Sequence, residues 1–452
     1  MSGIFGVTSN NSHSQMLTYY ALYALQHRGE YACGIATNTS GYIDYKKGYG
    51  LASSVIEEET LKILRGKVSL GHVSNSQVDI EKNEIDPKVI GYEDGTIAVN
   101  FDGHLLNYDR LKKITLDHGC EVENDTHTEI VANLIAINYN GDIEEAIVKT
   151  IKMLEGAFAI LIMEKNKIYA IRDRYGIKPL VYGKNDYASM FSSETCAFDA
   201  LSAEYVRDLE PGEMIVAEGD KIESKQILDK KCNKSCIFEV IYTSRPDSII
   251  NGMSVYKMRR NSGRKLAKTC PEGIDVVIAA PDSGTVASIG FAEGSKVAYG
   301  IGIIKNRYIG RTFIEKTEKT RVDKVRIKLN VLKEIIDGKN VLVVDDSIVR
   351  GTTMMRTVKM LKDAGAKSVH VRVASPMVFY NCKIGVNKSV TGKMLAMDHS
   401  LEEIRQAIGA DSLEYITYRD MVEAFGGEGH YCTGCINNVY PENLEELNGD
   451  RL

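Results

Sequence analysis

The stretch Val343-Val344-Asp345-Asp346-Ser347-Ile348-Val349-Arg350-Gly351-Thr352-Thr353 decides the fold of the second half of the chain. Apolar residues up to Val344 predict a strand buried on both faces, and Thr352 to Ala364 predict a helix that ends at Gly365. The loop and helix N-terminus offer free backbone N–H groups and a favourable dipole to a phosphate. Two adjacent aspartates suit a ribose diol and a hydrated Mg²⁺ ion. A ribose 5-phosphate fits this layout; the simpler interpretation is a surface turn capped by hydroxyl side chains.

The sequence on either side of this stretch alternates between apolar strands and helices. The predicted strands are Val276 to Ala280, Val297 to Gly300, Val341 to Asp345 and Val369 to Ala374. This alternation predicts a parallel α/β sheet, whose ligands lie at the carboxyl ends of the strands. The loop 280–285 follows the first strand and could bind pyrophosphate through its backbone amides. The basic loop 305–312 could close over the site as a lid, or could simply be a solvated surface loop.

The first 230 residues or so follow a different pattern, rich in β-strands. Helices are expected at 15–26, 129–137 and 142–154, and the strands are expected at 3–7, 68–72, 97–101, 157–163, 167–171 and 213–217. The polar, lysine-rich stretch 229–234 marks a boundary between domains at 1–230 and 231–452. Sheets with helices on their outer faces would form a four-layer sandwich, although spacing alone does not establish it.

Length, charge and cysteine content limit the classes of protein. A chain of 452 residues is too long for one ordinary core and suits two or three domains. A formal net charge of -5 argues against a nucleic-acid or membrane-surface protein. The sequence has no apolar run of membrane-spanning length and no signal peptide, so a cytoplasmic location is expected. Nine cysteines are therefore expected to be reduced rather than paired in disulfides.

Several runs resemble one enzyme family. The run 343–353 resembles the signature of type I phosphoribosyltransferases, which bind 5-phosphoribosyl-1-pyrophosphate (PRPP). Nearly the whole chain resembles the glutamine PRPP amidotransferase (amidophosphoribosyltransferase) family, with matching runs at 172–180, 209–213, 242–248, 305–314 and 326–329. The resemblance implies an N-terminal-nucleophile αββα glutaminase domain and a type I phosphoribosyltransferase domain of parallel α/β fold. Ammonia released in the first domain would travel internally to the second.

The resemblance also assigns roles in the transferase half. Asp345 and Asp346 would hold the ribose hydroxyls, and Mg²⁺ would bind near Ser283, Asp345 and Asp346. The 5-phosphate would lie on Ser347, Ile348, Val349, Arg350, Gly351, Thr352 and Thr353. Pyrophosphate would be bound by Asp282, Ser283, Gly284, Lys305 and Lys328, with Tyr308 in the lid.

The glutaminase half departs from the family pattern. Ser2 stands where the family has its nucleophilic cysteine, and Ser74 replaces the arginine that binds the glutamine carboxylate. Asp102, before Gly103, replaces the amide donor of the oxyanion hole, where loss of one donor costs about 10²–10³ in rate. His127 replaces the aspartate that binds the substrate ammonium group, and of the polar set Arg28 is retained. These changes predict a naturally inactive glutaminase.

Four cysteines match those that hold a [4Fe–4S] cluster in one branch of the family. They are Cys236, Cys382, Cys432 and Cys435, the last two forming a CxxC pair. Four thiolates form a complete ligand set for the cluster, and zinc is the alternative occupant. Because phosphoribosyl transfer needs no electrons, a cluster here would be structural or oxygen-sensing.

The sequence therefore favours a PRPP-dependent transferase that uses ammonia or another amine and has lost its glutaminase. One alternative is a complete glutamine-dependent enzyme of purine biosynthesis in which Ser2 works. A second is a non-catalytic subunit that binds PRPP or nucleotides. A homo-oligomer, dimer or tetramer, is expected from the resemblance alone.

Overall fold

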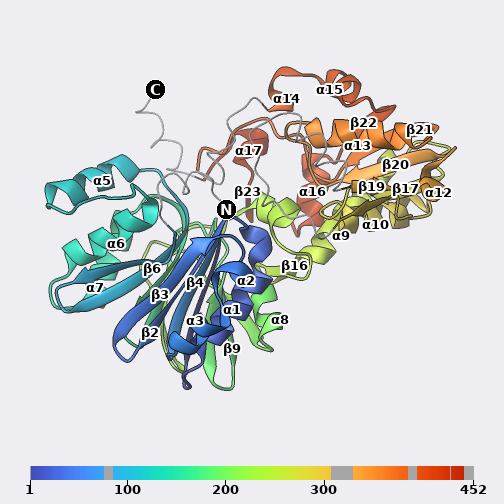
Figure 1. The fold of residues 1–452 in the computed structure, drawn as a ribbon. Helices are drawn as coiled ribbons and strands as arrows, with labels where there is room; N and C mark the ends of the chain where they lie inside the picture. Colours follow the sequence, from blue (N-terminus) through green and yellow to red (C-terminus); the bar gives the residue numbers. More distant parts are fainter. Residues whose placement is uncertain (1, 76–84, 307–328, 385–393, 428, 442–452) are drawn as a thin grey trace.

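The computed structural model of the chain describes residues 2–75, 85–306, 329–384, 394–427 and 429–441, and it has two parts that lie side by side (Figure 1). The N-terminal part contains two antiparallel sheets. In order across the first sheet, the strands are β11 (Glu204–Asp208), β9 (Val181–Asn185), β10 (Ala188–Ser192), β1 (Ser2–Ser9), β4 (Val68–Ser74), β2 (Ala32–Thr39) and β3 (Tyr42–Tyr49). In the second sheet they are β13 (Lys221–Gln226), β12 (Glu213–Glu218), β8 (Lys167–Arg172), β7 (Gly156–Glu164), β6 (Gly95–Leu105) and β5 (Lys88–Tyr92).

Side-chain alternation along the strands produces a four-layer arrangement. On β7, Phe158, Ile160 and Ile162 pack against the helices α5 (Tyr108–Asp117), α6 (His127–Asn138) and α7 (Ile143–Met153). The intervening Leu161 and Met163 face the first sheet, because successive strand residues point to opposite faces. The outer face of the first sheet packs against α1 (Ser14–Ala24), α2 (Ala52–Val55), α3 (Glu58–Ile63) and α8 (Cys196–Ala200). The predicted αββα sandwich is confirmed.

The C-terminal part contains a parallel sheet with helices on both faces. Its strands, in order, are β17 (Val276–Ala279), β20 (Asn340–Asp345), β21 (Ser368–Val373) and β22 (Ser412–Tyr415). On β20, Leu342 and Val344 pack towards α9 (Val255–Leu266), α10 (Thr285–Ser295) and α16 (Tyr418–Ala424). Val341 and Val343 pack towards α13 (Thr352–Asp363) and α15 (Leu401–Ile408). The predicted α/β class is confirmed, and the carboxyl ends of these strands all lie at one edge of the sheet.

The shorter elements connect these layers. They are β14 (Ser235–Cys236), β23 (Tyr431–Cys432), β15 (Ile249–Ile250), β16 (Met253–Ser254), β18 (Ile303–Lys305), β19 (Leu329–Val331), α12 (Lys333–Ile336), α14 (Leu395–Asp398), α17 (Gly434–Asn437), the short 3₁₀ helices η1 (Gln26–Arg28) and η3 (Ala267–Thr269), and the π-helical turn η2 (Glu239–Thr243). No helix among the described residues is long and apolar enough to cross a membrane.

One predicted strand is wrong. Val297 to Gly300 forms a single parallel bridge, between Val277 and Tyr299, rather than a strand. Two backbone hydrogen bonds join the segment to Val277, and the chain then passes through Gly300 and Gly302 to β18. The apolar run was therefore an edge segment that pairs over one residue.

Gly290 on α10 and Gly263 on α9 are two glycines that let these helices approach closely. A Cβ atom there would lie 1.9 Å from the carbonyl oxygen of Arg260, so Gly290→Ala should push the helices apart and cost about 1–3 kcal/mol of stability. Thermal unfolding followed by circular dichroism measures this. The control is Gly91→Ala on the edge strand β5, where the nearest neighbour would lie 3.9 Å away. Equal melting temperatures for Gly290→Ala and the wild type would contradict this packing.

Candidate functional site

The aspartate pair ends strand β20 and is held by hydroxyl groups. Ser283 donates from Oγ to Asp346 Oδ1 over 2.5 Å, and Ser347 donates to Asp346 Oδ2 over 2.8 Å. The backbone N–H of Asp346 donates to Asp345 Oδ1. Burial and the neighbouring Asp346 carboxylate raise the pKa of Asp345 well above its usual range. Two buried carboxyl groups that repel one another suit a divalent cation, whose charge offsets the repulsion.

The loop after the aspartates lines a cavity of about 420 Å³. Gly351 ends the loop with φ 75°, a conformation that favours glycine, and α13 begins at the next residue. Asp345 and Ser347 to Thr353 form one wall of the cavity. The remaining lining residues are Cys236, Phe238, Tyr242, Thr243, Met354, Val378, Tyr380, Asn381, Cys382, Met394 and Cys435. The structure therefore brings the predicted phosphate loop and Asp345 together around one space.

The predicted pyrophosphate loop lies beside the aspartates. Asp282, Ser283 and Gly284 connect β17 to α10, and Lys305 at the end of β18 pairs with Asp282 over 2.5 Å. Gly284 passes so close to β20 that a Cβ would lie 2.6 Å from the Val344 carbonyl oxygen. Two other predicted residues, Tyr308 and Lys328, lie outside the described residues.

The four predicted cluster cysteines gather from three separate segments. Cys236 on β14 lies opposite Cys432 on β23, and both pack with Cys382. Burial raises the pKa of Cys236 well above its usual range, and the Glu239 carboxylate and then the neighbouring cysteines Cys382, Cys432 and Cys435 raise it further. Among the described residues, no group of three or more His, Cys, Asp or Glu is arranged as a preformed metal site. The set supplies four sulfur donors in one neighbourhood, which suits the chemistry of a cluster.

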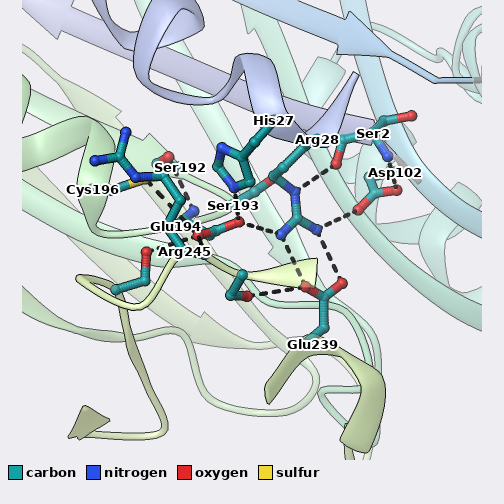
Figure 2. Close-up of polar contacts among 12 residues, drawn as sticks. Ser2, His27, Arg28, Asp102, Ser192, Ser193, Glu194, Cys196, Glu239 and Arg245 are labelled. Carbon is teal, nitrogen blue, oxygen red and sulfur yellow. Dashed lines mark hydrogen bonds and ion pairs between the residues drawn. The ribbon is translucent and has the colours of Figure 1, made fainter. Parts of the chain in front are cut away.

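Ser2 begins strand β1 next to a buried ion pair. Its N–H donates to Asp102 Oδ1 over 3.2 Å (Figure 2), and Lys178 Nζ donates to the same oxygen over 3.0 Å. Lys178 is placed by a tight turn in which Asp173 accepts several backbone N–H groups, including that of Lys178. Although burial opposes it, Lys178 and Arg28 hold the pKa of Asp102 below its usual range. Asp102 is therefore an ionised carboxylate beside Ser2.

Arg28 is the centre of the polar network in Figure 2. Its guanidinium donates to the Ser2 carbonyl over 2.9 Å, to Glu194 over 2.6 Å and to both oxygens of Glu239 at 2.9 and 3.0 Å. Its distance to Asp102 is 3.7 Å. Glu194 also receives bonds from the His27 ring and the Ser248 hydroxyl. This network connects the start of β1 to η2, whose Tyr242 and Thr243 line the cavity.

The other predicted glutaminase residues fall in two places. Ser74 pairs directly with Ser2 across β1 and β4, and Gly103 follows Asp102 on β6. His127 begins α6, stacks on Phe101 with a centroid distance of 5.7 Å, and contacts His104 over 2.9 Å. The structure thus joins Ser2, Arg28, Ser74 and Asp102 directly, and places His127 against the same strand as Asp102.

Sequence reasoning missed the partners of these charges. Glu194 and Glu239 lie 166 and 211 residues from Arg28 along the chain, so no local spacing indicates them. Lys178 lies in the run 172–180 that resembles the family, but the sequence gives it no partner. A buried aspartate at position 102 requires a cation, and that requirement is the signal that could have led to Lys178.

Comparison with known proteins assigns the chain to a family. Residues 73–200 match the model of a glutamine amidotransferase domain, and residues 255–376 match that of a phosphoribosyl transferase domain. The amidophosphoribosyltransferase of Archaeoglobus fulgidus is 39% identical over 448 residues, covering 98% of each chain. The chain belongs to the amidophosphoribosyltransferase family. The enzyme of that name from Mycobacterium tuberculosis strain H37Rv is 40% identical, covering 98% of this chain and 86% of its own length.

Solved structures agree with this assignment to the amidophosphoribosyltransferase family. The Bacillus subtilis glutamine PRPP amidotransferase, complexed with ADP and GMP, superposes with a TM-score of 0.91 at 36% identity over 97% of each chain. A structure described as the allosteric regulatory enzyme of purine biosynthesis superposes with a TM-score of 0.90, also at 36% identity, over 97% of this chain and 96% of its own. The enzyme class expected from the sequence is confirmed.

Arg259 holds the turn that carries Glu239. It is buried on α9 and donates to the carbonyls of Val240 and Ser244. Arg259→Met should leave both carbonyls without a donor and cost about 3 kcal/mol. The neighbouring Arg260 forms exposed ion pairs with Glu293 and lies over the Tyr256 ring at 5.9 Å, so Arg260→Met should change the unfolding midpoint far less. Urea unfolding compares the two variants, and equal midpoints would contradict the role of Arg259.

Proposed function

We propose that this chain catalyses the amidophosphoribosyltransferase reaction of purine biosynthesis with glutamine as the nitrogen donor. Ammonia would attack C1 of PRPP, the C1–O bond to pyrophosphate would break, and 5-phosphoribosylamine would form. The observation that carries the proposal is the pair Asp345 and Asp346 at the end of β20, continuous with a loop that lines the cavity. Relatives that share the whole length of the chain carry the same enzyme name.

Different groups of residues would bind different parts of PRPP. Asp345 and Asp346 would bind the ribose hydroxyls, and the loop from Ser347 to Thr353 would bind the 5-phosphate at the N-terminus of α13. Asp282 to Gly284, together with Lys305 and Lys328, would hold the pyrophosphate, and Tyr308 would belong to the lid. Mg²⁺ held by Ser283, Asp345 and Asp346 would neutralise the leaving pyrophosphate. Catalysis would come mainly from orientation and electrostatics.

The nitrogen source is the point on which two proposals differ. Whole-length similarity to amidophosphoribosyltransferases, including the glutamine amidotransferase domain at 73–200, favours the complete glutamine-dependent enzyme. In that enzyme, the Ser2 hydroxyl would attack the glutamine amide, with its own α-amino group as base. These comparisons favour this function over the loss of glutaminase, which the sequence analysis placed first.

The second candidate is a transferase that uses free ammonia or another amine. It is favoured by the ionised Asp102 carboxylate beside Ser2, because a negative charge there would oppose an oxyanion formed on the amide. Ser74 would also supply no positive charge for the glutamine carboxylate, and His127 would supply no carboxylate for its ammonium group. Both candidates use the same transferase half.

One experiment separates the candidates. Pyrophosphate release from PRPP and Mg²⁺ is followed in anaerobically purified protein, with glutamine or ammonium chloride supplied separately. Glutamate formed in proportion to pyrophosphate supports the glutamine-dependent enzyme, and release with ammonium alone supports the second candidate. No release with either contradicts the glutamine-dependent and the ammonia-dependent transferase, and leaves another amine as the nucleophile or a non-catalytic binding subunit.

The aspartate pair provides a test of the transferase half. Asp346→Asn removes a carboxylate that would bind ribose and metal, so pyrophosphate release with either nitrogen source should fall by about 10²-fold. Asp363→Asn, on the exposed end of α13, is the matched control and should retain wild-type rates. Wild-type turnover in Asp346→Asn would refute the assigned role.

We also propose that Cys236, Cys382, Cys432 and Cys435 hold a [4Fe–4S] cluster. Anaerobically purified protein should contain about four iron and four sulfide per chain. Cys435→Ser should lose this iron, whereas Cys232→Ser, at an exposed thiol outside the group, should retain it. Stoichiometric zinc without sulfide would contradict the cluster. The domain boundary near residue 230, the cytoplasmic location and the homo-oligomer stay predictions.

A further inference from the structure

The nitrogen atom of Ser2 lies against a carboxylate. In the encoded chain this nitrogen belongs to the peptide bond with Met1, and it donates to Asp102 Oδ1 over 3.2 Å. Removal of Met1 would convert it into the primary amine that serves as base for the Ser2 hydroxyl. An amine accepts a proton only in its neutral form, so the charges around it govern the nucleophile.

Asp102 has unused capacity to accept hydrogen bonds. The residue is 2% exposed, and its Oδ1 atom already accepts from Ser2 and Lys178. Its Oδ2 atom accepts no hydrogen bond within the described part of the chain, and lies 3.7 Å from the Arg28 guanidinium. A peptide nitrogen has one N–H to donate, whereas a primary ammonium has three. Once Met1 is removed, the Ser2 ammonium group could therefore donate a hydrogen bond to Asp102 Oδ2 as well as to Oδ1.

Charged groups from several elements surround this point. The carboxylates of the network are Asp102 on β6, Glu194 after β10 and Glu239 on η2, and the permanent cations are Arg28 on η1 and Lys178 after β8. His72 on β4 contributes no charge near neutral pH, because burial lowers its pKa to about 4. His27 contacts Glu194 at the opposite end of the network. Arg259 on α9 also acts on Glu194 and Glu239, so the carboxylate that the Ser2 nitrogen meets directly is that of Asp102, with Arg28 and Lys178 as the neighbouring cations.

We infer that Asp102 is a positioning residue that holds the α-amino group of processed Ser2 as an ammonium ion and so restrains the nucleophile. The inference rests on the proposed glutamine-dependent reaction and deepens it. An opposite charge at this distance moves a titration midpoint by about 1–3 pH units. The amine should therefore titrate at least one unit above the ordinary α-amino range of about 7.7–8.0. The rate of glutamine cleavage should increase towards alkaline pH, as the same amine loses its proton.

The test measures the amine directly. Cyanate carbamylates neutral amines, so initial rates of carbamylation at Ser2 are measured from pH 6 to about pH 11 on the full-length protein by mass spectrometry of the N-terminal peptide. Asp102→Asn should lower the midpoint by about 1–3 units, and Lys178→Met should raise it because it removes a competing cation. Glu164→Gln is the control, since this buried carboxylate lies five residue pairs further along the β6–β7 ladder and should cause no shift.

The outcomes separate this inference from the proposed function. A midpoint in the ordinary range that Asp102→Asn leaves unmoved would overturn it, as would a mature chain that retains Met1. Opposite shifts in Asp102→Asn and Lys178→Met, each with a native circular dichroism spectrum, would support it. If those shifts occur but no glutamate forms at any pH, the role of Asp102 stands and the glutamine-dependent function fails.

Discussion

The buried guanidinium of Arg28 is the constraint on which both ends of the molecule depend. It is 1% exposed, and it binds the Ser2 carbonyl, Glu194 and Glu239 at once. A buried charge is tolerated only when it is paired and hydrogen-bonded, so each of these partners must be in place for the others to be stable. The first strand, the segment after β10 and the turn before α9 are therefore fixed relative to one another. That turn also carries Tyr242 and Thr243 into the wall of the cavity.

The two ends of this arrangement bring different chemical groups together. The transferase end keeps the strand, aspartate pair, glycine loop and helix that suit a phosphorylated ribose, and all of them lie at one edge of the parallel sheet. The nucleophile end keeps the strand pairing and Arg28, but Asp102 and Lys178 place an ion pair beside Ser2. Whole-length similarity favours a working glutaminase, whereas this ion pair restrains it. The similarity and the ion pair agree if the Asp102 carboxylate binds the terminal amine, because this slows the Ser2 nucleophile without removing it.

Much of the fold could be predicted from local sequence. Strand β20, the loop and α13 follow from an apolar run, Gly351 and Gly365, since each feature acts within a few residues. The apolar run 157–163 likewise predicts strand β7 from local sequence. Val297 to Gly300 shows the limit, because an apolar edge segment has no signal for how many residues will pair. The partners of Arg28 and Asp102 could not be predicted, since Glu194, Glu239 and Lys178 meet them only after both sheets and η2 have assembled.

The most direct test of this account is a double-mutant cycle on Arg28 and Glu239, measured as free energies of unfolding in urea. Arg28→Met should cost about 3–5 kcal/mol because it leaves Glu239 and Glu194 buried without this cation. Glu239→Gln should cost less, because Arg28 keeps Glu194 as a partner. The double variant should cost less than the sum by about 0.5–3 kcal/mol, since the interaction between Arg28 and Glu239 is then lost only once. Additive costs would show that the two residues do not stabilise one another, and would contradict the view that Arg28 connects Ser2 to the turn that lines the cavity.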